Sequence, residues 1–165
     1  MHYHGIDEER TISKTNKLLL SYRDLNIELH KLRITTSVSA VQYDGMPKSV
    51  TNVNTAENAL IDELQSLEER KATINLRISM IKQTILGMQD IDYKTERLAK
   101  LLKYYYIKRY SINKCCFELT NVFIDDPEEN ENDPLSRSSF YRYRKQGLLS
   151  FALLYPVSND VIVKN

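Results

Sequence analysis

The chain has 165 residues, of which 42% are hydrophobic and 27% are charged, and its formal net charge is +1. This composition supports a buried core in one domain or two very small ones, and it excludes wholesale disorder. Four glycines and four prolines are too few for a turn-rich β-sandwich or barrel, and no glycine-rich phosphate loop occurs. We therefore expect an all-α fold.

The first predicted helix covers residues 8–32. Its apolar residues Leu18, Tyr22, Leu25, Leu29 and Leu32 are alternately four and three positions apart, which is the spacing of a coiled-coil seam. A linker is predicted over residues 35–52, because its centre, Tyr-Asp-Gly-Met-Pro at 43–47, contains Asp-Gly and Met-Pro pairs that favour turns.

The second predicted helix, residues 53–88, carries a longer seam of the same spacing. Its positions are Leu60, Leu64, Leu67, Lys71, Ile74, Ile78, Ile81, Ile85 and Met88, and Lys71 is the one exception to the apolar rule. Such a helix would be about 54 Å long, so the first helix would cover only part of the seam in an antiparallel hairpin. The remainder predicts a second copy of the chain. Residues 1–89 are thus expected to form a coiled-coil-like hairpin that oligomerises.

Residues 90–165 are predicted to form a helix-turn-helix domain that binds DNA. After a helix over 92–109, Ser111 is a suitable N-cap for a helix over 112–119, and Ser136 for one over 137–155, which Pro156 closes. Between these two helices lies an acidic loop, residues 121–135, that contains six Asp and Glu residues and no Lys or Arg.

Positive charge is concentrated in this domain. Outside the acidic loop, residues 97–150 contain ten basic residues and a single acidic one, Glu118. The basic residues are Arg97, Lys100, Lys103, Lys108, Arg109, Lys114, Arg137, Arg142, Arg144 and Lys145. A solvated helix surface would explain some of them. The run Arg-Ser-Ser-Phe-Tyr-Arg-Tyr-Arg-Lys at 137–145 contains no acid at all and favours a polyphosphate partner instead.

The helix pair has a predicted inner and outer side. Cys115, Cys116 and Leu119 are expected to face inward, against a stripe formed by Phe140, Tyr143, Gly147, Leu148 and Phe151. The tyrosines at 104–106 are expected to pack beneath the pair rather than to stack on bases. The opposite side of the second helix carries Arg137, Ser138, Tyr141, Arg142 and Lys145, as a recognition helix requires.

The sequence also resembles phage late-operon transcriptional regulators of the RinA/ArpU type. The resemblance spans roughly residues 18–155 and is carried by the turn at 43–47 and by the segments YYYIKRYSINKCCFEL and LSRSSFYRYRKQGLLSFALLY. It implies a domain similar to sigma-factor region 4 and activation of packaging, morphogenesis or lysis genes. It also implies that Ser136 is a cap and that Ser139, Tyr141, Arg142 and Lys145 are exposed. The expected DNA-binding residues are Arg137, Ser138, Ser139, Tyr141, Arg142, Arg144 and Lys145.

One departure from the family concerns the acidic loop, because the turn between the two helices is usually short there. The loop either points away from DNA, or masks the basic helix until a partner displaces it, or the helix pair docks differently.

The sequence contains no pattern typical of a catalytic or metal-binding site. We expect no catalytic residues, no metal and no cofactor, since His2 and His4 sit at a terminus and the adjacent cysteines form no CxxC motif. Neither a signal peptide nor a spanning helix is predicted, so the expected location is the cytoplasm of a bacterial host. The expected partners are double-stranded DNA, further copies of the chain and host RNA polymerase, with no membrane. Two alternatives stay open: a small terminase-like protein that binds a packaging site, and a coiled-coil adaptor that binds only protein.

Overall fold

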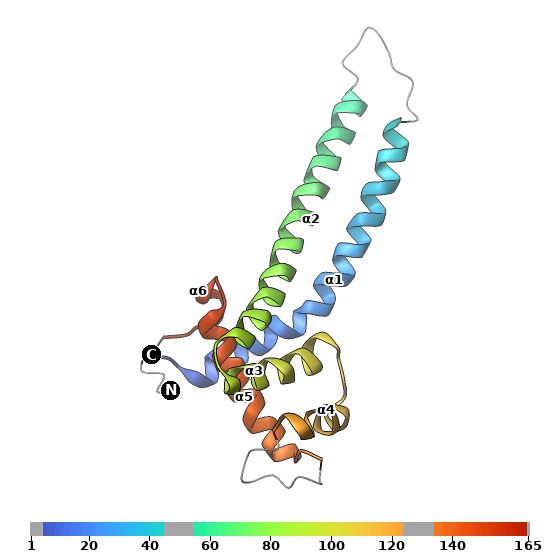
Figure 1. Ribbon diagram of the computed structural model, residues 1–165. Coiled ribbons are helices and arrows are strands. Elements are labelled where there is room, and N and C mark those ends of the chain that lie inside the picture. Colours follow the sequence, from blue (N-terminus) through green and yellow to red (C-terminus); the bar gives the residue numbers. More distant parts are fainter. Residues whose placement is uncertain (1–4, 45–54, 124–133, 165) are drawn as a thin grey trace. The chain divides into compact units, whose positions relative to one another are not determined.

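The computed structural model of the protein describes residues 5–44, 55–123 and 134–164 (Figure 1). Its helices are α1 (Glu8–Asp44), α2 (Thr55–Gly87), α3 (Tyr93–Leu102), α4 (Ile112–Leu119), α5 (Arg137–Leu154) and α6 (Ser158–Val161). Short 3₁₀ turns occupy Met88–Asp90 and Thr120–Val122, and a π-helical segment covers Lys103–Ile107. No strand occurs in the described ranges, so the all-α prediction is confirmed. None of the helices there is long and apolar enough to cross a membrane.

The chain divides into two compact units. One contains Met1–Tyr22 and Met80–Asn165, and the other contains Arg23–Ser79. This division differs from the expected boundary between residues 89 and 90, because the first turns of α1 and the last turns of α2 belong with the C-terminal helices. Buried side chains from both segments, among them Leu19 and Ile81, explain that association.

The Arg23–Ser79 unit is an antiparallel pair of helical arms, one from α1 and one from α2 (Figure 1). Leu29, Leu32, Ile74 and Ile78 are buried in it. On its surface, Arg70 Nε donates a hydrogen bond of 2.9 Å to Glu28 Oε1. The seam predicted for α2 is therefore confirmed at these positions.

The linker predicted from residue 35 is wrong up to residue 44, because α1 continues to Asp44. Ser, Thr and Val lower helix propensity, but here the hydroxyls find partners within the helix. Thr35, Thr36 and Ser37 each donate to a carbonyl four residues earlier, at 2.8–3.0 Å. The turn residues Gly45, Met46 and Pro47 lie outside the described part of the chain. The α1 arm is therefore longer than predicted.

The other unit has a helical core around α5. Helix α3 packs against α5, and α4 packs against both. The fully buried side chains include Leu98, Leu101 and Leu102 of α3, Leu119 of α4, and Phe140, Leu148 and Phe151 of α5. The third predicted helix, residues 92–109, is corrected by the structure: its α-helical part ends at Leu102 and continues as the π-helix.

Side-chain caps fix the starts of α3, α4 and α5. Asp92 accepts a hydrogen bond from the Thr95 backbone N–H at 2.8 Å, Ser111 from that of Lys114 at 3.3 Å, and Ser136 from that of Ser139 at 3.1 Å. The backbone hydrogen bond from Thr95 lowers the pKa of Asp92. Both predicted serine caps are confirmed.

Candidate nucleic-acid interface

The α4–α5 pair packs as the sequence predicts. Cys115, Cys116 and Leu119 are buried on α4. On α5, Phe140, Tyr143, Gly147, Leu148 and Phe151 are buried. Gly147 allows the close approach of α3, since a Cβ at this position would lie 3.3 Å from Cγ of Leu102. Because this side of α5 is buried in the pair, its cations lie on the opposite side.

The outer face of α5, which we call the basic face, consists of Arg137, Ser138, Tyr141, Arg142 and Lys145. Arg137, Ser138 and Lys145 are exposed, Tyr141 is 44% exposed and Arg142 is half-buried. Their positions, three and four residues apart, lie on one side of a helix. Three cations and two hydroxyls thus share the first half of α5.

Arg137 connects the starts of the two helices. Its Nη2 donates a hydrogen bond of 2.8 Å to Oδ1 of Asn113, which lies in the first turn of α4. The first turns of α4 and α5 therefore adjoin. Because backbone N–H groups carry positive partial charge at a helix start, this junction is electropositive beyond its formal charges.

Arg142 is held in place by a column of rings. Its guanidinium lies 4.9 Å from the Tyr143 ring centroid, and Nη2 donates to the Tyr143 hydroxyl at 3.2 Å. Tyr143 stacks on Phe123 with ring centroids 4.1 Å apart. The guanidinium of Arg97 lies 5.0 Å from the centroid of the Phe123 ring. Arg142 thus has a preferred orientation. Sequence reasoning missed this column, because its members come from three separate segments.

Two residues of the expected DNA-binding set lie elsewhere. Ser139 is only 7% exposed, and its hydroxyl accepts a 2.9 Å hydrogen bond from Ser136, so the expectation of an exposed Ser139 is wrong. Arg144 is half-buried and points to α1 and the π-helix, where Nη2 donates to Asn16 at 2.6 Å and Nε to the Tyr106 hydroxyl at 2.9 Å. Both side chains are engaged inside the unit rather than on the basic face.

Acidic residues border one edge of the basic face. Glu8 and Glu9, at the start of α1, line a hollow of about 700 Å³ together with Tyr141, Arg142 and Lys145. No pattern in the sequence brings residues 8 and 9 to this place. These two carboxylates lower the positive potential at this edge, so the junction of α4 and α5 is the more electropositive end of the basic face.

The predicted acidic loop lies mostly outside the described residues, which resume at residue 134. Its flanks are anchored: Phe123 and Leu135 are 1% and 3% exposed. His2 and His4 also lie outside the described part. Within that part no group of three or more His, Cys, Asp or Glu residues could hold a metal ion. Burial raises the pKa of the free Cys115 thiol to about 11, which opposes thiolate formation.

No family model matches the chain, and neither a curated protein nor a solved structure matches it.

Proposed function

We propose that this chain is a sequence-specific activator of phage or prophage late genes that binds double-stranded DNA and has no enzymatic activity. In this proposal the first half of α5 enters the major groove. One observation carries the DNA-binding part of it: the basic face presents three cations and two hydroxyls, while the other side of α5 is buried against α3 and α4. The late-gene setting comes from the resemblance of residues 18–155 to RinA/ArpU-type regulators. A recognition helix needs this division, with base and phosphate contacts on one side and packing on the other.

The cations of the basic face have different proposed roles. Arg142 lies in the second turn and is oriented by Tyr143. An oriented guanidinium suits bidentate hydrogen bonding to a guanine edge. Lys145 is exposed and lies nearly a turn further on, which suits a phosphate contact. Arg137 is proposed to contact the backbone beside Asn113.

The proposed setting is the cytoplasm of a bacterial host, with RNA polymerase as a further partner. We also propose a homo-oligomer, in which two DNA-reading units address two half-sites. The support is a stripe on the outer side of the α1 arm, formed by Ile27, Ile34, Val38 and Val41. These side chains are 43–73% exposed and follow heptad spacing.

Selection of bound duplexes from a random pool, followed by anisotropy titrations with the enriched duplex, tests the proposal. Arg142→Ala should weaken binding to the enriched duplex by about 1–3 kcal/mol and binding to random DNA much less. Lys145→Ala should weaken both alike and reduce the salt slope by about one. Lys82→Ala, which removes an exposed cation from α2, is the matched control and should bind as the parent does.

Three results would contradict parts of this proposal. No binding of the parent chain to any duplex at low salt would contradict the proposal and favour a protein-binding adaptor. Ring assembly with stimulation of a packaging ATPase would favour a terminase-like role. Parent-like binding by both α5 variants would show that α5 is not the reader.

A further inference from the structure

The corner between α3 and α4 is a second basic surface, formed by residues outside α5. Residues 103–114 contain Lys103, Lys108, Arg109 and Lys114 and no acidic residue. The backbone is irregular there, because the π-helix of Lys103–Ile107 precedes the Ser111 cap of α4. Single turns of π-helix are rare and frequently occur at functional sites.

Two lysines of this corner are held against tyrosine rings. Lys108 Nζ lies 4.7 Å from the Tyr104 ring centroid and 5.5 Å from that of Tyr110. Lys114 Nζ lies 3.9 Å from the Tyr110 centroid, and the two rings are 5.6 Å apart. Lys108 and the two rings form a nearly equilateral triangle, and Lys114 lies over the Tyr110 ring. The lysines are therefore partly ordered before any ligand binds, which reduces the entropy lost on binding.

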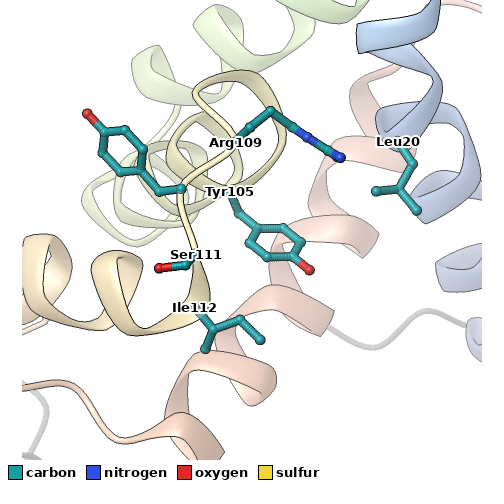
Figure 2. A pocket seen from close by; sticks show the side chains of 6 residues that line it. Leu20, Tyr105, Arg109, Ser111 and Ile112 are labelled. Atoms are coloured by element: carbon teal, nitrogen blue, oxygen red, sulfur yellow. The ribbon is translucent and has the colours of Figure 1, made fainter.

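Arg109 is the most unusual residue of the corner. Its φ of 57° lies in the left-handed region, which makes it the sole non-glycine residue with positive φ in the described ranges. Glycine or asparagine would adopt this backbone more easily than arginine. Arg109 and Tyr105 line a hollow of about 330 Å³. Figure 2 shows Leu20 across from them. None of the residues that line this hollow is acidic.

A strained backbone in a basic corner suggests that the arginine is there for its side chain. The neighbouring donors agree, because Tyr105 and Ser111 also line the hollow and carry hydroxyls. Guanidinium, ammonium and hydroxyl groups are the side chains that proteins use for phosphate oxygens.

We infer that this corner is a second contact for the DNA backbone, with Arg109, Lys108 and Lys114 as its phosphate-binding residues. The inference rests on the proposed function and extends it to a surface outside α5. The two surfaces are continuous: Lys114 follows Asn113, and Asn113 accepts the hydrogen bond from Arg137 at 2.8 Å. DNA that places its groove on α5 would thus lay one phosphate strand along the starts of α5 and α4 and on to the corner.

A substitution at Arg109 separates a binding role from a structural one. Arg109→Gly removes the guanidinium and also the backbone strain that a positive φ imposes on a residue with a side chain. Thermal stability should therefore stay the same or rise. DNA affinity should nevertheless fall about eightfold at 0.1 M salt, and the salt slope should fall by about 0.9, for enriched and random duplexes alike. Arg109→Lys keeps the charge and should bind within about twofold of the parent, since a backbone phosphate accepts either cation.

Lys108→Ala and Lys114→Ala should show the same sequence-independent loss, with Lys82→Ala as the unaffected control. If the parent chain binds DNA and the Arg109→Gly, Lys108→Ala and Lys114→Ala variants keep its affinity and salt slope, this inference is overturned and the proposed function is unaffected. Loss of retention on immobilised poly-glutamate with unchanged DNA binding would also overturn it, in favour of an acidic protein surface. Absence of DNA binding by the parent would overturn both.

Discussion

Arg144 and Tyr106 connect the proposed reading helix to the rest of its unit. Arg144 Nε donates to the Tyr106 hydroxyl over 2.9 Å, and that hydroxyl donates in turn to Asn16 Oδ1 over 2.6 Å. The Asn16 oxygen also accepts from Arg144 Nη2 at 2.6 Å, so the three side chains close a triangle between α1, the π-helix and α5. Both acceptors of the guanidinium are neutral. Desolvation raises the pKa of Tyr106, and its hydrogen bond with Arg144 opposes that rise.

Tyr106→Phe should destabilise the protein by about 1–3 kcal/mol, because a half-buried guanidinium and the Asn16 amide each lose a partner while the ring is retained. Urea unfolding followed by circular dichroism measures this change. Tyr110→Phe is the matched control. Its ring contacts Tyr104 and two lysines at the surface, and its loss of a hydroxyl should leave the midpoint nearly unchanged. Equal effects of the two substitutions would show that the triangle adds no stability.

The starts of α4 and α5 could be predicted because the signals are local. A serine cap lies next to each helix, and the apolar spacing that follows marks its buried side. The end of α1 could not be predicted in this way. Its residues 35–44 have low helix propensity, and the hydroxyls of Thr35, Thr36 and Ser37 find acceptors within the helix instead of ending it.

The candidate site was predictable only in part. The composition of 137–145 indicates a basic helix, and helical spacing places Arg142 and Lys145 on its outer side, but the expected DNA-binding set also included Arg144. Arg144 points inward to its acceptor Asn16, which lies 128 positions earlier in the chain. The spacing of residues within one helix does not reveal such a contact. For the same reason Glu8 and Glu9 could not be placed beside α5.

Gly147 and Gly87 should respond oppositely to alanine. At Gly147 a Cβ would lie 3.3 Å from Cγ of Leu102, a side chain with no exposed surface and little room to move. Gly147→Ala should therefore destabilise by about 1 kcal/mol even though alanine favours helices. At Gly87 nothing lies within 4 Å of a Cβ, and its φ of −60° is helical, so Gly87→Ala should stabilise by up to about 1 kcal/mol. Equal shifts in the urea midpoint would contradict this interpretation.

The raised pKa of Cys115 predicts a dependence of stability on alkaline pH. Desolvation by burial raises this pKa from 9.0 to about 11, so the unfolded thiol ionises first. The stabilisation is thus fully present below about pH 9 and is lost as the pH rises towards 11. Unfolding curves between pH 8 and 11 should show a steeper loss of stability for the parent than for Cys115→Ala. Parallel curves would mean that the thiol keeps its ordinary pKa in the folded protein.

The apolar stripe on α1 is the proposed contact between copies of the chain. Ile34, Val38 and Val41 are 67%, 54% and 73% exposed, and charged residues are absent between Ile34 and Tyr43. Exposed side chains of this kind contribute little to the fold of a single chain, whereas pairing of two stripes would remove them from water.

Val38→Glu combined with Val41→Glu should convert a dimer or larger oligomer into a monomer, because each partner would then bury carboxylates. Light scattering coupled to size-exclusion chromatography measures the mass, and an unchanged helical spectrum shows that the arms still fold. Ala40→Glu, an exposed position on α1 off the stripe, adds one charge without touching it and should leave the mass unchanged. If the homo-oligomer joins two half-sites, the double variant should also bind the enriched duplex more weakly, since coupling between sites is lost. A parent chain that is already monomeric at micromolar concentration would exclude the stripe as a self-association surface.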